Sequence, residues 1–150
     1  MKQRFRIGKI SFQDPLILCG AFAILLYFDA SGFLRVGLLA AVLHEMGHIM
    51  AYLFLCHRFP HIEVTMTGFC MKTRKEHFSA NEQLLLAAAG PGGNILLAVL
   101  AVFCLSRRAT IWWSAFFAAN LLTGAFNLLP IPPLDGAQIL RCLMQSIPRK

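Results

Sequence analysis

The chain has 150 residues, enough for one domain. It is 57% hydrophobic and only 14% charged, with a mean hydropathy of +0.63, whereas soluble domains carry about 25% charged residues. The apolar residues occur in long runs, which excludes an ordinary soluble fold and favours a membrane protein. The net charge of +7 does not indicate nucleic-acid binding, because the basic residues form no continuous patch. The five cysteines are scattered without a CxxC spacing, which argues against a thiolate metal site or a disulfide framework.

The first apolar segment covers residues 15–28 and follows a basic tail. Cleavage of a signal peptide near Ala30 would require small residues that Phe28 does not provide. We therefore predict an uncleaved but short first span, with a re-entrant hairpin as the alternative. A polar turn at residues 29–32 precedes a second span over residues 33–55, which is long enough to cross a hydrocarbon layer of about 30 Å.

Residues 56–83 are polar and basic. Within them, residues 62–67 alternate apolar and polar side chains before Gly68, which predicts a small β-hairpin. This strand is also a candidate to hold an extended substrate by edge pairing.

The third span covers residues 84–105, and we expect Gly90–Gly93 to interrupt its helix, either for close helix packing or for a role in a site. The fourth covers residues 111–127 and meets a segment with three prolines at 128–133, which a regular helix cannot continue through. A last helix is predicted from Asp135 to about Ser146.

These segments predict an all-α membrane protein with about four transmembrane segments, the fourth broken by the proline-rich stretch, and a small cytoplasmic β-hairpin. Residues 1–150 form a single membrane-embedded domain in this interpretation. Placing both termini and the 56–83 loop in the cytoplasm puts 11 of the 14 Lys and Arg residues inside and leaves Arg35, Arg107 and Arg108 outside, as the positive-inside rule favours.

An HExxH sequence, His44-Glu45-Met46-Gly47-His48, lies within the second span. Residues four apart share one face of a helix, so both imidazoles can reach one metal ion, and Glu45 can reach a water bound to it. Ionisable residues within a span cost about 2.5–3.5 kcal/mol each, so a functional role is the default interpretation. The pattern predicts zinc.

A catalytic zinc site needs a third protein ligand. Position 54, where an extended HExxHxxGxxH pattern would need histidine, holds Phe54, and His57, His61 and His77 lie in the loop. Asp135 stands in an apolar stretch, where a lone carboxylate needs a partner. His48 lies about 22 Å along its span and Asn127 about 24 Å along the fourth, so Asp135 can reach the depth of His48.

Three segments together resemble the site-2 protease family of intramembrane zinc proteases: the HExxH sequence, residues 89–94 (Ala-Gly-Pro-Gly-Gly-Asn) and residues 127–136 (Asn-Leu-Leu-Pro-Ile-Pro-Pro-Leu-Asp-Gly). The segment ending in Gly68-Phe69 is similar to the family's strand after HExxH, and the compact chain resembles most the branch of the stage IV sporulation protein FB. Ala137 departs from the family's second glycine.

The resemblance implies a bacterial cytoplasmic membrane, one zinc per chain held by His44, His48 and Asp135, and Glu45 as the general base. It implies that Asn127 contacts the substrate or the developing oxyanion, although Asn127 can also cap its helix. The expected partners are the bilayer, a membrane-anchored protein such as a transcription factor precursor, and a membrane-protein regulator. The alternatives are a catalytically inactive membrane scaffold and a metal-transport protein.

Overall fold

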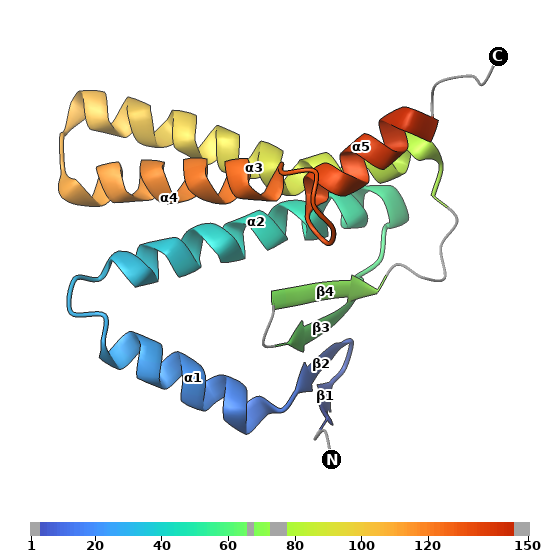
Figure 1. The fold of residues 1–150 in the computed structure, drawn as a ribbon, viewed down its shortest axis with the longest axis horizontal. Helices are drawn as coiled ribbons and strands as arrows, with labels where there is room; N and C mark the ends of the chain where they lie inside the picture. The colour runs from blue at the N-terminus through green and yellow to red at the C-terminus, as the bar shows by residue number, and fades with distance from the viewer. Residues whose placement is uncertain (1–3, 66–67, 73–77, 146–150) are drawn as a thin grey trace.

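The computed structural model describes residues 4–65, 68–72 and 78–145, and most of them are helical. Figure 1 shows the helices α2, α3 and α4 side by side, with a small sheet next to α2 and with α1 diverging from the others. The elements in chain order are β1 (Arg4–Ile7), β2 (Ile10–Gln13), α1 (Pro15–Tyr27), α2 (Phe33–Cys56), β3 (His61–Thr65), β4 (Gly68–Lys72), α3 (Ala80–Arg107), α4 (Ile111–Asn127) and α5 (Asp135–Gln145).

The turns that begin the long helices explain how the bundle is laid out. Asp29 accepts hydrogen bonds from the backbone N–H groups of Leu34 (3.3 Å) and Arg35 (3.2 Å), which satisfies free donors at the start of α2. Ser79 and Glu82 form a capping box that starts α3. Both helices therefore begin at defined residues, which fixes where their side chains meet.

The sheet is larger than the predicted hairpin. The β3–β4 hairpin is present, but β2 pairs with β3 in parallel and β1 pairs with β2, so the strand order is β1-β2-β3-β4. The sequence interpretation missed β1 and β2, although Phe5 and Phe12 belong to an alternating pattern around a Gly8-Lys9 turn. Strand β3 has neighbours on both edges, so the expectation that it binds substrate by edge pairing is wrong.

The apolar face of the sheet packs close to the HExxH helix. Ile62 and Val64 of β3 are buried with Leu18 of α1, and Phe12 and Ile49 pack against this cluster. Because Ile49 directly follows His48, the sheet supports the segment of α2 that carries the metal-binding motif.

Helix α3 runs without interruption through Pro91, so the predicted break at Gly90–Gly93 is wrong. Packing explains the difference. Gly90 and Pro91 are buried between neighbouring helices, and a Cβ on Gly124 of α4 would lie 3.7 Å from the Pro91 carbonyl oxygen. Tertiary contacts on both sides hold the helix together despite the donor that proline removes.

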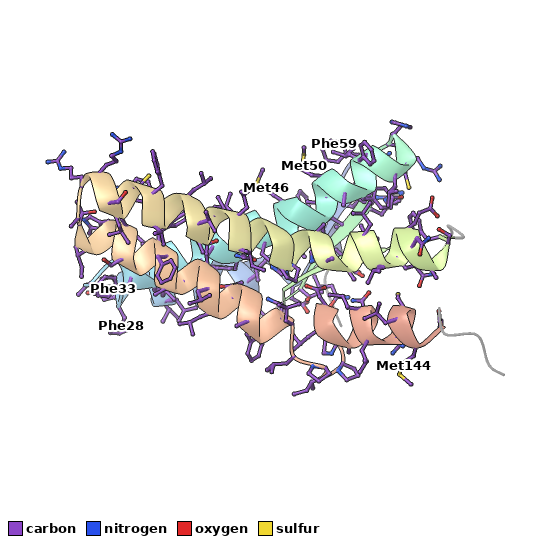
Figure 2. All side chains as sticks on the ribbon, turned by 90° about the horizontal axis from the view of Figure 1, so that it is seen from above. Phe28, Phe33, Met46, Met50, Phe59 and Met144 are labelled. Atoms are coloured by element: carbon purple, nitrogen blue, oxygen red, sulfur yellow. The ribbon has the colours of Figure 1, made fainter. Side chains whose placement is uncertain are left out.

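Two helices, α2 and α3, are long and apolar enough to cross a membrane. Helix α1 has 13 residues and α4 has 17, which correspond to about 20 and 26 Å. The expectation of four crossings therefore stays a prediction. Large apolar side chains cover the surface, and Figure 2 shows Met46 and Met50 projecting from α2 and Met144 from α5. Such a surface suits lipid better than water.

Candidate metal centre

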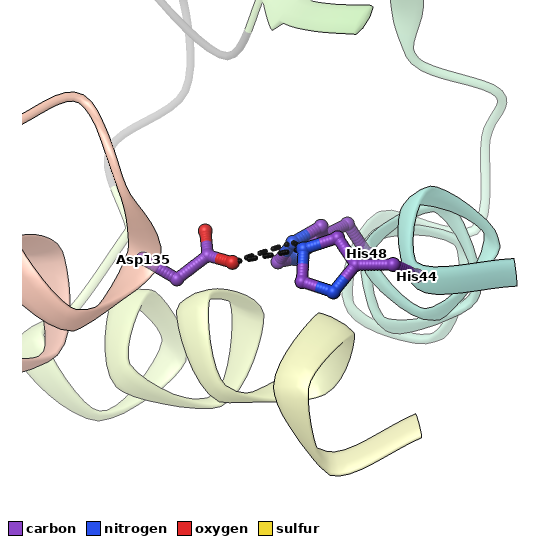
Figure 3. A group of neighbouring side chains, drawn as sticks. All are labelled: His44, His48 and Asp135. Atoms are coloured by element: carbon purple, nitrogen blue, oxygen red, sulfur yellow. Dashed lines mark hydrogen bonds and ion pairs between the residues drawn. The ribbon is translucent and has the colours of Figure 1, made fainter. Parts of the chain in front are cut away.

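Three predicted ligands from two distant parts of the chain converge at one point. His44 and His48 lie one turn apart on α2, and Asp135 is the first residue of α5. The Asp135 Oδ2 atom lies 3.0 Å from His44 Nε2 and 3.2 Å from His48 Nε2, and the two Nε2 atoms are 3.2 Å apart. Figure 3 shows the carboxylate and both imidazoles pointing towards one another. In the described part of the chain, these residues are the only group of three found that could hold a metal ion.

The second ring nitrogen of each histidine determines which nitrogen is free for a metal. His44 Nδ1 lies 2.6 Å from Asn94 Oδ1, and His48 Nδ1 lies 2.8 Å from the Leu86 carbonyl oxygen. Both partners only accept hydrogen bonds, so each Nδ1 must carry the proton. Each Nε2 is then left with its lone pair directed at the centre, which is the arrangement that metal-binding histidines use.

This donor set fits zinc. Two imidazole nitrogens and one carboxylate oxygen make up a three-ligand catalytic zinc site, with the fourth position left for water or substrate. His44 and Asp135 are buried, with 4% and 8% of their surfaces exposed. A buried carboxylate between two imidazoles is compensated when a cation joins them.

Glycines make room for the three ligands. A Cβ on Gly90 of α3 would overlap the Nε2 atom of His48 and lie 2.7 Å from His44 Cε1, and a Cβ on Gly136 would overlap the Leu128 carbonyl oxygen. Gly90 therefore lets α3 approach the imidazoles, and Gly136 lets the start of α5 lie against the end of α4. The role of Gly90–Gly93 is thus close packing at the site itself.

We expect Gly90→Ala to weaken zinc binding by about 10-fold or more, because the added methyl displaces both imidazoles from their positions. Gly92→Ala is the matched control, since no atom lies within 4 Å of its added Cβ and alanine favours a helix over glycine. The measurement is zinc affinity by competition with a chelating dye. Equal affinities of the two variants would show that Gly90 does not shape the site.

Glu45 is adjacent in sequence to a ligand but is not part of the ligand group. It is partly buried, and it interacts electrostatically with His48, His44 and Asp135. This position beside the three ligands suits a proton carrier that acts on a water at the centre.

Asn127 ends α4, and its Nδ2 donates to the Thr123 carbonyl oxygen at 2.9 Å. Its predicted contact with substrate stays a prediction. His57 and His61 are exposed and do not belong to the ligand group, and His77 is outside the described residues. His57 directly follows α2, but His61 begins strand β3, so the expectation that it is a loop residue is wrong. The sequence interpretation did not single out Asn120, a fully buried amide in the middle of an apolar helix. Such a position is the signal that could have identified it.

Comparisons with known proteins find similarity to zinc metalloproteases. The model of peptidase family M50 matches residues 106–150. A protein named "Putative zinc metalloprotease" in Methanocaldococcus jannaschii is 32% identical over 72 residues, which are 45% of this chain and 38% of that protein. Another with the same description, in Bacillus subtilis, is 33% identical over 75 residues, covering 41% of this chain and 34% of its own length. The matched region is therefore less than two fifths of either relative.

The fold also matches a solved structure. A site-2 protease from Methanocaldococcus jannaschii superposes with a TM-score of 0.65, covering 97% of this chain and 73% of that chain at 20% sequence identity. At this identity the match concerns the fold. The predicted resemblance to the site-2 proteases is confirmed by these comparisons taken together, and the sporulation branch within the family stays a prediction.

Proposed function

We propose that this chain is a member of peptidase family M50, the site-2 protease family, and that it is a zinc endopeptidase that cleaves membrane-anchored proteins within or near a transmembrane segment. The observation that carries the proposal is the convergence of His44, His48 and Asp135 at one point, with Glu45 beside them. A glutamate directly after the first histidine of HExxH is placed as the general base of a zinc protease would be.

Each residue has a defined task in the proposed reaction. His44, His48 and Asp135 would hold zinc, which when bound lowers the pKa of a coordinated water towards 7 and polarises the scissile carbonyl. Glu45 takes the proton from the attacking water and passes it to the leaving amine. The buried surroundings of His44 and Asp135 limit the access of bulk water and strengthen these electrostatic interactions.

The depth of the site supports cleavage inside a membrane. His48 is 15 residues from the start of α2, about 22 Å along the helix axis at 1.5 Å per residue. A substrate bond must reach this level to be cut, which favours a peptide within or close to a transmembrane segment.

Charge and aromatic residues support a membrane orientation with both termini in the cytoplasm. The turns α1–α2 and α3–α4 lie at the same end of the molecule (Figure 1). Of the Lys and Arg residues that the structure describes, only Arg35, Arg107 and Arg108 are near that end, and such a low number is typical of the outer side. Trp112 and Phe28 are exposed there. Aromatic residues favour the interface between lipid and water. We assign this end to the outer side of a bacterial cytoplasmic membrane.

The expected partners are a transcription factor precursor as the substrate and a membrane-protein regulator.

The test is cleavage of single-span membrane proteins by the purified chain in lipid vesicles. We expect a fragment to form with zinc, to disappear when a chelator removes the metal, and to return when zinc is added back. A fragment that persists in metal-free chain would contradict the proposal.

We expect Asn127→Ala to reduce kcat by about 10²–10³-fold, the loss typical of one oxyanion donor. Asn127 Nδ2 has two hydrogens, and the bond to Thr123 uses one of them, which leaves the second for a substrate carbonyl. Zinc affinity should not change in this variant. An unchanged kcat would assign Asn127 to the end of its helix alone.

A further inference from the structure

Two asparagines are buried in the helix bundle beside the metal centre. Asn94 of α3 is 1% exposed and Asn120 of α4 is 0% exposed. Burying an amide costs free energy unless its donors and acceptors are paired. Here they are paired with each other, because Asn94 Nδ2 donates to Asn120 Oδ1 at 3.0 Å.

The hydrogen bonds of this pair run in one direction. Asn120 Nδ2 donates to the backbone carbonyl of Phe116 at 2.9 Å, which can only accept. This bond turns Asn120 Oδ1 towards α3, where it accepts from Asn94 Nδ2. Asn94 must then present Oδ1 to His44 Nδ1 at 2.6 Å, so that His44 keeps its proton on Nδ1 and a bare Nε2.

We propose that Asn120 is a positioning residue of the metal centre: by orienting the Asn94 amide, it holds His44 in the tautomer that can bind zinc. The inference rests on the zinc site proposed above. The two hydrogen bonds link Asn120 of α4 to the ligand His44 of α2 through Asn94 of α3.

The alternative orientation of Asn94 shows why an orienting partner matters. If the amide of Asn94 turned over, its Nδ2 would face His44 Nδ1, which would then have to accept a hydrogen bond. The proton would move to Nε2 and occupy the lone pair that a metal needs. The second bond of Asn94 Nδ2, to the Ala40 carbonyl oxygen at 3.4 Å, is long and holds the amide less firmly.

His48 needs no such device. Its Nδ1 donates to the Leu86 carbonyl oxygen, a backbone group that cannot exchange a donor for an acceptor. The two histidines are therefore oriented by different means, and only His44 depends on side chains that can turn over.

The test measures zinc affinity of the full chain by competition with a chelating dye. We expect Asn120→Leu to lower zinc affinity by about 10–100-fold, the usual loss when a residue that helps to orient a metal ligand is removed. Ser114→Ala is the control, because it also removes a bond from a side chain to the carbonyl four residues earlier, at 3.3 Å, on the same helix. Ser114→Ala should bind zinc as the wild-type chain does.

A second-site variant separates orientation from packing. In Asn94→Asp both carboxylate oxygens accept, so His44 Nδ1 finds an acceptor in either orientation and no orienting partner is required. We therefore expect Asn120→Leu to cause no further loss of zinc affinity in the Asn94→Asp background. Asn120→Ala is measured in the same two backgrounds, in case leucine does not fit.

The outcomes are distinct. The positioning role would be overturned if Asn120→Leu bound zinc with wild-type affinity. It would also be overturned if the Asn120 variants lost as much zinc affinity in the Asn94→Asp background as in the wild-type background, or misfolded there. Asn120 would then be a packing residue. If the wild-type chain itself bound no zinc in this assay, the proposed function would fail, and this inference with it.

Discussion

Glu45→Gln should abolish detectable cleavage while leaving zinc in place. Gln has nearly the same size as Glu but cannot take up a proton, so the variant loses the base and keeps the fold. Loss of a general base typically lowers the rate by about 10²–10⁴-fold. The measurement is kcat of the purified, zinc-loaded variant on a single-span membrane protein, with zinc content determined on the same sample. The uncut substrate should still bind and should co-purify with the variant.

The control for Glu45→Gln is a glutamate outside the centre. Glu82 belongs to the capping box of α3 and is not one of the metal-binding residues. Glu82→Gln should therefore cleave at the wild-type rate. Cleavage by zinc-loaded Glu45→Gln at the wild-type rate would exclude the proposed mechanism. The centre would then have to be interpreted as part of an inactive scaffold or a transport site.

Asp135→Ala should lower zinc affinity by more than about 100-fold, beyond the 10–100-fold cost of losing an outer-shell partner. The variant removes the only anionic ligand and leaves two imidazoles, which do not complete a three-ligand site. Cleavage should be lost together with the metal. Zinc bound per chain and dye competition measure the effect directly.

Asp29→Asn is the matched control for this loss, because Asp29 and Asp135 are equally buried at 8% exposure. Asp29 accepts hydrogen bonds from Leu34 and Arg35 at the start of α2 and does not belong to the metal-binding group. The control should retain zinc. Full zinc content in Asp135→Ala would mean that a residue elsewhere supplies the third ligand.

The centre could be predicted because its ligands are identified by their spacing in the sequence and by their estimated depth along the helices. His44 and His48 are four residues apart on a helix, so their meeting requires no knowledge of the fold. Asp135 required one further step: α2 and α4 both start at the same end, and the estimated depth along each placed the carboxylate level with His48. The predicted starts of these helices at Phe33 and Ile111 agree with the structure.

The parts that the sequence did not reveal depend on contacts between distant segments. Residues 90–93 have poor helix propensity, and only packing against α2 and α4 explains why α3 continues through them. Strands β1 and β2 lie in a basic tail whose role is decided by pairing with β3. The bond between Asn94 and Asn120 joins positions 26 residues apart on two helices, which no local pattern specifies.

The bond that is cut tests the central claim most directly. A single-span membrane protein incubated in vesicles with the zinc-loaded chain should yield two fragments whose masses place the new ends within or next to the transmembrane segment, with no fragments from Glu45→Gln under the same conditions. An intact substrate in the presence of the zinc-loaded chain, or new ends only in polar regions far from the membrane, would contradict an intramembrane zinc protease.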